Sequence, residues 1–190
     1  FLYERLRREV QERMELLAPA GEKEIALAAL RAGADACYVG GLWSARAYAK
    51  NFDERDLLDT LDFAHAHGKK VYVALNTMLD TRELADALSY TGRLYDAGVD
   101  AIIAADLGYI AEAHARFPGL ALHASTQAGV QSAAGAALLQ SLGCTRVVAA
   151  RECTMADLRA MAQAGIEVEA FCHGAMCSSV SGACLMSGVL

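Results

Sequence analysis

The 190-residue sequence predicts an α/β fold in which about seven parallel strands alternate with helices. Three observations lead to this prediction: short apolar runs recur along the chain, an alanine-rich helical stretch follows most of them, and a glycine precedes each later run. Most of these glycines suit the left-handed conformation that ends a helix before a strand. They lie 21 to 35 residues apart, the length of one strand–helix unit, and are Gly33, Gly68, Gly98, Gly119, Gly143 and Gly165.

The strands are predicted from the apolar runs, which are continuous rather than alternating, as is typical of parallel strands covered on both faces. In chain order the runs are MELLAPAG (14–21), ADACYVGG (34–41), KKVYVALNT (69–77), DAIIAADLG (100–108), LALHASTQ (120–127), TRVVAARE (145–152) and IEVEAFCHG (166–174). Seven βα units favour a parallel (β/α)8 barrel of the TIM type that is incomplete, with its last unit absent or beyond residue 190. A doubly wound open sheet is the competing arrangement, although no G-x-G-x-x-G opens the first helix.

Residues 1–13 precede the first run, and we expect them to form a separate N-terminal helical extension. Leu2, Leu6, Val10 and Met14 recur every four residues with charges between them, as in a short amphipathic helix. Residues 14–190 are then one barrel domain, truncated before its C-terminal part.

Composition and charge argue against several classes of protein. The net charge is −6 and no block of Lys or Arg occurs, so a broad basic surface for nucleic acid is not visible. No apolar run is long enough to span a bilayer, and the N-terminus lacks the layout of an export signal. We therefore expect a cytoplasmic protein without membrane insertion. Its six cysteines then indicate reduced thiols or metal ligands rather than a disulfide framework.

Polar residues follow the predicted strands at their carboxyl ends, which form the reactive face of a parallel barrel. As a group they predict a polar pocket. Its catalytic candidates are His123, Gln127, Arg151, Glu152 and His173, and its cofactor-binding candidates are Asn76, Asp106, Ser125 and Thr126.

Simpler interpretations exist for some of these candidates. Asn76 and Asp106 are equally well explained as caps of the following helices, each worth about 1 kcal/mol. The four hydrogen-bonding residues of HASTQ (123–127) exceed what one cap requires. The adjacent Arg151 and Glu152 could form an internal ion pair or an anchor for an anionic ligand.

Cys177 and Cys184 lie in a stretch of Gly, Ala and Ser, with six residues between them. Three uses are open: ligands of a metal or iron–sulfur cluster, a nucleophile with His173 or another polar residue as base, or no chemical role. The spacing does not fit a zinc ribbon, whose paired cysteines are separated by two to four residues. A cluster would also need ligands from beyond residue 190 or from elsewhere in the fold. Cys37, Cys144 and Cys153 are most simply small core or rim residues.

Residues 169–187, EAFCHGAMCSSVSGACLMS, match a signature that reads E-x-F-x-x-G-S/A-aliphatic-C-x4-G-x-C-x-aliphatic-S. It is the signature of the peptidase U32 family, which the chain therefore resembles. The segments MELLAPAG, GADACYVGG, ARAYAKNF, HASTQ and RVVAARE resemble other recurrent blocks of that family.

The resemblance leaves three kinds of function open: a peptidase, a hydroxylase and a non-catalytic subunit. The family is named for collagenase-like peptidases, although neither H-E-x-x-H nor G-x-S-x-G occurs in this sequence. Other members are similar to oxygen-independent hydroxylases that act on a pyrimidine of tRNA or rRNA, with prephenate as apparent oxygen donor, or on the ubiquinone ring. A non-catalytic role, as a paralogous partner subunit, is the third, and a homodimer is an alternative assembly. Of these we favour the hydroxylase, with RNA ahead of quinone.

The resemblance also implies a [4Fe–4S] cluster on four cysteines. Cys177 and Cys184 would be the first two ligands, and the other two would lie beyond residue 190. Ring hydroxylation without O2 calls for a redox cofactor, because no side chain readily supplies one. We expect Arg151 or His123 to face the carboxylates of the donor.

Overall fold

The computed structural model describes residues 14–44, 52–174 and 177–184, and it confirms the predicted fold class. The predicted N-terminal extension, residues 1–13, lies outside these ranges. The strands are β1 (Leu17–Ala20), β2 (Ala36–Gly40), β3 (Lys70–Leu75), β4 (Ala101–Ala104), β5 (Ala121–Ala124), β6 (Arg146–Val148) and β7 (Glu167–Glu169). The helices are α2 (Lys23–Arg31), α3 (Glu54–Ala66), α4 (Thr81–Asp96), α5 (Leu107–Arg116), α6 (Ala133–Ser141) and α7 (Met155–Gln163), with a 3-10 turn, η1 (Thr126–Ala128).

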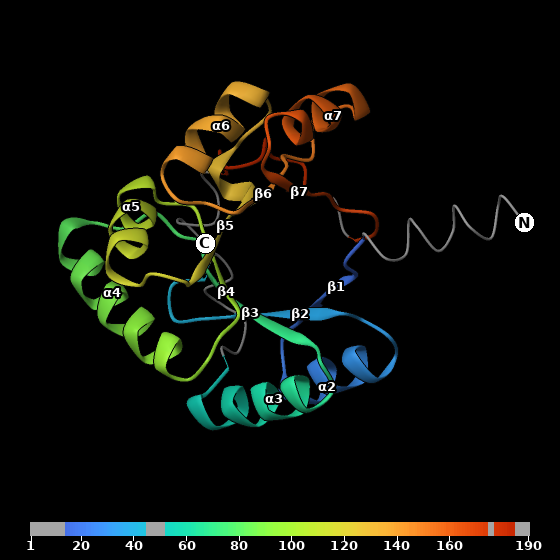
Figure 1. Ribbon diagram of the computed structural model, residues 1–190, viewed down its shortest axis with the longest axis vertical. Coiled ribbons are helices and arrows are strands. Elements are labelled where there is room, and N and C mark those ends of the chain that lie inside the picture. The colour runs from blue at the N-terminus through green and yellow to red at the C-terminus, as the bar shows by residue number, and fades with distance from the viewer. Residues whose placement is uncertain (1–13, 45–51, 175–176, 185–190) are drawn as a thin grey trace, which may run out of the picture.

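The strands form one parallel sheet whose spatial order, β1 to β7, is also their order along the chain. A doubly wound sheet reverses direction at a switch point, so this order excludes that alternative. The sheet is curled with the helices on its outside, and β1 and β7 are its two edges (Figure 1). The fold is therefore an incomplete barrel of the TIM type.

Both faces of the sheet are largely buried from β2 to β6, but they differ in chemistry. On β5, Leu122 and Ala124 join the large apolar cluster that packs under the helices. Ala121, on the same strand, packs against a small inner cluster formed by Ala36, Tyr72, Ala74, Ala101 and Ile103. The inward face also carries the polar residues His123 and Arg146, each at most 5% exposed. The runs of β2 to β6 are thus covered on both sides, as predicted, although their inward side is not wholly apolar. The first and last runs form the edge strands β1 and β7, which are partly exposed.

Local signals explain where the helices begin and end. All six glycines predicted to end helices have a positive φ, between 64° and 114°. At the other end of α4, the Asp80 carboxylate accepts the backbone N–H of Glu83, and the Glu83 carboxylate accepts the N–H of Asp80. Thr154 and Asp157 form the same reciprocal pair at the start of α7. Such capping boxes satisfy backbone donors that have no partner inside the helix.

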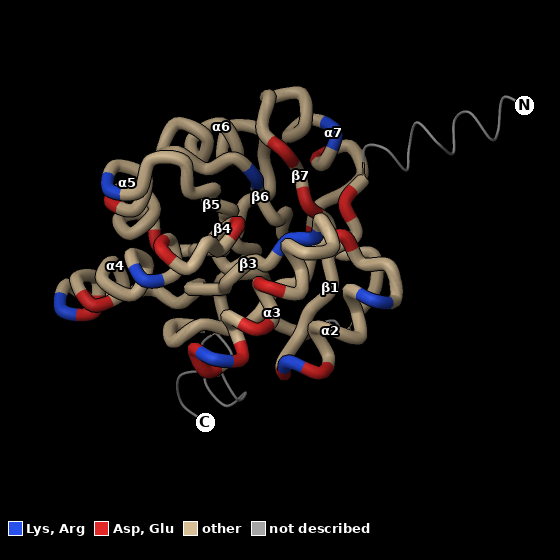
Figure 2. Tube along the Cα trace, turned by 60° about the horizontal axis from the view of Figure 1, so that its bottom comes forward, with Lys and Arg blue, Asp and Glu red and all other residues tan. Residues whose placement is uncertain are grey.

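The outer surface carries charges of both signs. In the view of Figure 2, Lys and Arg on the helices are interspersed with Asp and Glu. This mixture agrees with the absence of a basic block in the sequence. None of the helices in the described ranges has the length and apolar character needed to cross a membrane.

Candidate active site

Two predicted residues meet at the carboxyl ends of β3 and β5. Asn76 follows β3, and its Nδ2 donates a hydrogen bond to Ser125 Oγ at 3.2 Å. Ser125 is 2% exposed, and its Oγ also accepts the backbone N–H of Gln127 at 3.2 Å, which starts η1. Asp80, rather than Asn76, caps α4. The helix-cap interpretation of Asn76 is therefore wrong, and Asn76 instead links the ends of two strands.

For Asp106 the cap interpretation is confirmed. Its Oδ1 accepts the backbone N–H of Tyr109 at 2.8 Å, at the start of α5. Its Oδ2 accepts the N–H of Leu79 at 3.3 Å, which ties the β3–α4 connection to the same helix. Both carboxylate oxygens thus bind backbone groups, and a cofactor-binding role for Asp106 stays a prediction.

Arg151 and Glu152 bind the segment 177–184, which we call the signature loop. Glu152 Oε1 accepts the backbone N–H of Ser181 at 2.9 Å, and this hydrogen bond lowers the pKa of the Glu152 carboxyl. Arg151 Nη2 donates to the carbonyl oxygen of Ser179 at 2.9 Å. The backbone N and the Nε of Arg151 both donate to Ser181 Oγ at 3.3 Å. The pair therefore acts as an anchor, and what it holds in this structure is a loop of the same chain.

The signature loop also lies against the β5–α6 connection. Thr126 Oγ1 donates to Ser181 Oγ at 3.5 Å. Gly182 has φ +77°, and a Cβ built there would overlap the carbonyl oxygen of Gln127. Glycine is required at this position twice over, by its backbone conformation and by the close approach of η1. Thr126, Gln127, Arg151 and Glu152, predicted as one group, are thus brought together around the loop.

The two signature cysteines occupy the two ends of this loop. Cys177 is exposed, and its Sγ accepts the backbone N–H of Ser179 at 3.5 Å. That N–H, followed by the Arg151 guanidinium, lowers the pKa of the Cys177 thiol and favours the thiolate. Cys184 is half-buried. Thiolates that accept backbone N–H groups are the donors that iron–sulfur sites use.

The described residues do not form a metal site by themselves. Among them, no group of three or more His, Cys, Asp or Glu side chains is placed to hold a metal ion. Cys172 is exposed, as is His173, and both follow β7 without joining such a group. The assignment of Cys177 and Cys184 as two ligands of a four-cysteine site stays a prediction. The assignment of His173 as a catalytic base stays a prediction.

His123 lies inside β5 rather than at its end, and its ring is buried in the barrel. The ring meets Tyr72 edge-on, with centroids 4.8 Å apart. Burial, together with the nearby Arg146 charge, lowers the His123 pKa to about 3, so the imidazole is neutral. Its Nδ1 is buried and has no hydrogen-bond partner among the described residues. The predicted pocket at the strand ends thus does not include His123 on its rim.

An ionic cluster that the sequence analysis missed surrounds Arg146 inside the barrel. The Arg146 guanidinium binds Glu15 at 2.8 Å, Glu167 at 2.9 Å and Glu169 at 3.3 Å. The Tyr72 hydroxyl donates to Glu15, with both carboxylate oxygens 2.8 Å away. Burial raises the pKa of Glu169, whereas for Glu15 the hydrogen bonds from Arg146 and Tyr72 outweigh burial and lower it. The sequence did contain one sign of this cluster: residues 167 and 169 are two positions apart, which places both side chains on the same face of β7.

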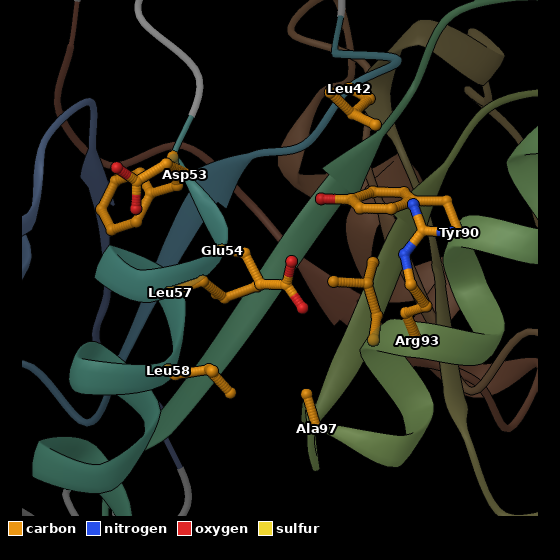
Figure 3. Close-up of a pocket in the computed structure, with 10 residues that line it drawn as sticks. Leu42, Asp53, Glu54, Leu57, Leu58, Tyr90, Arg93 and Ala97 are labelled. Carbon is orange, nitrogen blue, oxygen red and sulfur yellow. The ribbon is translucent and has the colours of Figure 1, made fainter.

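A separate pocket lies outside the barrel, between α3 and α4. Its volume is about 240 Å³, and Figure 3 shows Leu57 and Leu58 of α3 opposite Tyr90 and Arg93 of α4. The Arg93 guanidinium lies over the Tyr90 ring, 5.3 Å from its centroid. None of the residues predicted from the sequence as site residues lines this pocket.

Comparison with known proteins places these features in a family. The sequence model of peptidase family U32 matches residues 21–190. The chain is 41% identical to the 23S rRNA 5-hydroxycytidine C2501 synthase of Escherichia coli, over 92% of this chain and 26% of the relative. It is 35% identical to tRNA hydroxylation protein P1 of Bacillus subtilis, over 95% of this chain and 43% of the relative. It is 33% identical to a collagenase of Porphyromonas gingivalis, over 91% of this chain and 44% of the relative. The chain thus spans less than half the length of each of these relatives.

A solved structure supports the fold independently. The U32 peptidase Mk0906 superposes on this chain with a TM-score of 0.71, covering 83% of this chain and 68% of the other. Sequence identity over that match is 16%. At this level of identity the likeness concerns the barrel architecture alone.

Proposed function

The chain belongs to peptidase family U32, and on that premise we propose that the protein hydroxylates a pyrimidine of tRNA or rRNA without O2, using an iron–sulfur cluster. Two relatives named for hydroxylation of RNA, from Escherichia coli and Bacillus subtilis, support the reaction and the substrate class. The collagenase is less similar to this chain than either of them.

One observation carries the proposal: the signature loop is docked on Arg151 and Glu152 at the reactive end of the barrel. The loop bears Cys177 at one end and Cys184 at the other. In a parallel barrel the substrate binds at the carboxyl ends of the strands. The docking therefore supports a redox centre placed beside the substrate rather than on the outer surface.

We assign Cys177 and Cys184 as two of the four ligands of a [4Fe–4S] cluster. Replacing a ring hydrogen by a hydroxyl group removes two electrons from the base, and the oxygen donor would take up both as its own C–O bond breaks. A bound cluster would supply one-electron redox chemistry to this exchange. This chain contributes the two thiols, the Ser179 N–H beside one of them, and the Arg151 charge that favours the thiolate form.

For the oxygen donor we retain prephenate, whose two carboxylates require cations or hydrogen-bond donors. Arg151 lies at the strand ends and is the cation candidate. His123 is neutral and buried inside the barrel, below the strand ends, so of the two predicted residues it is the less favoured. Donor affinity of the wild type can be compared with that of the Arg151→Lys and His123→Gln variants by isothermal titration. Unchanged affinity in both variants removes this assignment.

The proposed function is tested in cells that lack the gene. Mass spectrometry of digested tRNA and rRNA should show the loss of one hydroxylated pyrimidine, and the wild-type gene should restore it. The Cys177→Ser and Cys184→Ser genes should not. Unaltered RNA together with a depleted hydroxylated quinone would instead favour the quinone ring, and unaltered RNA and quinone would contradict a hydroxylase.

The collagenase-like peptidase is the second candidate, since Cys177 is an exposed thiol whose pKa is lowered. With His173 as base, it would be a cysteine nucleophile. The purified protein would then cleave gelatin, and the Cys177→Ser and His173→Ala variants would not. A paralogous partner subunit, a homodimer and a cytoplasmic location stay predictions, which copurification and cell fractionation can check.

A further inference from the structure

Ser181 is the one buried residue of the signature loop, and in the sequence it lies between Cys177 and Cys184. It is 7% exposed, whereas Cys177, Ser178, Val180, Gly182 and Ala183 are exposed. Three donors converge on its Oγ: the backbone N and Nε of Arg151, both at 3.3 Å, and Thr126 Oγ1 at 3.5 Å. Its own N–H donates to Glu152. Both the side chain and the backbone of Ser181 are thus bound to the barrel.

The loop has little secondary structure of its own. Within its described residues one backbone hydrogen bond is seen, from the N–H of Ala183 to the carbonyl of Val180 at 3.0 Å. A short loop with so few internal bonds keeps one conformation only if outside groups hold it. Here those groups are Arg151, Glu152 and Thr126, and three of their contacts end on one hydroxyl group.

Two glycines allow the close approach that these bonds need. A Cβ at Gly129, in the β5–α6 connection, would come within 3.2 Å of the carbonyl oxygen of Ser181. Gly182, next to Ser181, would overlap the Gln127 carbonyl if it carried a Cβ. The backbones of the loop and of the β5–α6 connection therefore touch directly on both sides of the buried hydroxyl.

We propose that Ser181 is a positioning residue that fixes Cys177 and Cys184 relative to the barrel before any metal binds. Its effect reaches Cys177 through Arg151, which binds Ser181 Oγ through Nε and the Ser179 carbonyl through Nη2. The N–H of that same Ser179 donates to the Cys177 sulfur. Its effect reaches Cys184 through the short Gly182-Ala183 link, whose start is pinned against Gln127. The part of the inference that concerns the cluster rests on the proposed function.

The metal-free protein tests the positioning claim by itself. Ser181→Ala removes the hydroxyl, and Ser178→Ala, an exposed serine in the same loop, is the matched control. We expect the hydrogen-bonded backbone amides of Ser179, Ser181 and Ala183 to exchange hydrogen about tenfold faster in Ser181→Ala, the factor that the loss of roughly one hydrogen bond to a charged group gives. A bifunctional thiol reagent should bridge Cys177 and Cys184 several times more slowly. Far-ultraviolet circular dichroism checks that the barrel is intact.

The full-length protein, reconstituted with iron and sulfide without oxygen, tests the consequence for the cluster. Ser181→Ala should shift the midpoint potential and the electron paramagnetic resonance spectrum of the bound cluster, and Ser178→Ala should match the wild type. Rates of exchange and bridging equal to those of Ser178→Ala overturn the inference. So does faster exchange with an unchanged cluster spectrum. If the wild type itself takes up no iron, the hydroxylase proposal fails, and the bridging rate alone then decides whether Ser181 positions the thiols.

Discussion

The carboxylate of Glu152 accepts the backbone N–H of Ser181 at 2.9 Å, and so joins the end of β6 to a loop that begins 25 residues later, at Cys177. With the Arg151 bonds beside it, this contact gives the chain a fixed platform for its two signature thiols. Four of the residues predicted for a ligand pocket serve this platform. The reactive end of the barrel is therefore organised around the loop.

Replacing Glu152 should make the platform insensitive to acid. The pKa of Glu152 is lowered in the fold, so its contribution is present above the unfolded pKa of about 4.3 and is lost as pH falls through the folded pKa. Wild-type Ser181 amide exchange, corrected for the intrinsic rate, should thus rise as pH falls from 6 to 3. Glu152→Gln keeps an acceptor oxygen and should remove this rise. An identical pH profile in both proteins would contradict the assigned bond.

Gly182→Ala should disturb the loop more than any substitution of the exposed Ser178. The new Cβ meets the Gln127 carbonyl, and the backbone φ of +77° is strained for alanine. We expect iron uptake on reconstitution to fall at least tenfold, with the thermal midpoint of the barrel nearly unchanged. Iron content and a melting curve check this. Full iron uptake by Gly182→Ala would show that η1 does not constrain the loop.

Arg146→Ala should destabilise the barrel strongly. Arg146 is 5% exposed and binds two half-buried carboxylates and one exposed carboxylate, so its removal leaves the half-buried charges without their main partner. Breaking a fully buried pair costs about 3–5 kcal/mol, and we expect a cost toward the lower end because solvent reaches these carboxylates. The control is Arg116→Ala, an exposed pair with Glu112 on α5, which should cost at most about 0.5 kcal/mol. Urea unfolding measures both, and equal costs would contradict a buried cluster.

Tyr72→Phe should move acid unfolding to higher pH. Desolvation raises the Glu15 pKa, but hydrogen bonds from Arg146 and Tyr72 outweigh it, so the net shift is downward. Stability from Glu15 is then present above its unfolded pKa and is lost as pH falls through the folded one. Loss of the Tyr72 hydrogen bond raises the pKa of Glu15 in the folded protein. The pH range over which Glu15 stabilises the fold therefore becomes narrower. Tyr95→Phe, an exposed tyrosine whose hydroxyl bonds the Pro118 carbonyl, is the control and should leave the acid midpoint in place.

His123 should stay neutral well below the usual range of histidine. Burial and the Arg146 charge lower its pKa to about 3, against roughly 6.5 for an unperturbed side chain. As pH falls from 6.5 toward 3, the unfolded state binds a proton at His123 that the folded state does not. The free energy of unfolding therefore decreases over this range and is unaffected by His123 above it. Ring-nitrogen chemical shifts should show neutral imidazole at pH 5. A titration of His123 between pH 5 and 7 would place the ring in contact with solvent.

The positions of the strands along the chain were predictable because each strand carries a local sequence signal. Continuous apolar runs and a glycine after each helix depend on neighbouring residues only, and the seven strands appear where those signals lie. The ends of strands were less predictable. HASTQ was interpreted as one polar end, yet β5 stops at Ala124, so His123 belongs to the barrel interior.

The candidate site was predictable in composition but not in its connections. Asn76 and Ser125 contact each other across 49 residues of sequence, and Arg146 binds Glu15 across 131. Such pairs depend on how far the sheet curls, which no local pattern records. Ser181 escaped notice for another reason: a serine among Gly, Ala and Ser gives no signal until its hydroxyl is seen to be buried.

The iron and sulfide content of the full-length protein, purified without oxygen, tests the central claim most directly. The account predicts about four iron and four sulfide per chain, a brown colour, and loss of both in Cys177→Ser and in Cys184→Ser. A colourless wild-type protein without iron, or variants that retain the wild-type iron content, would contradict it.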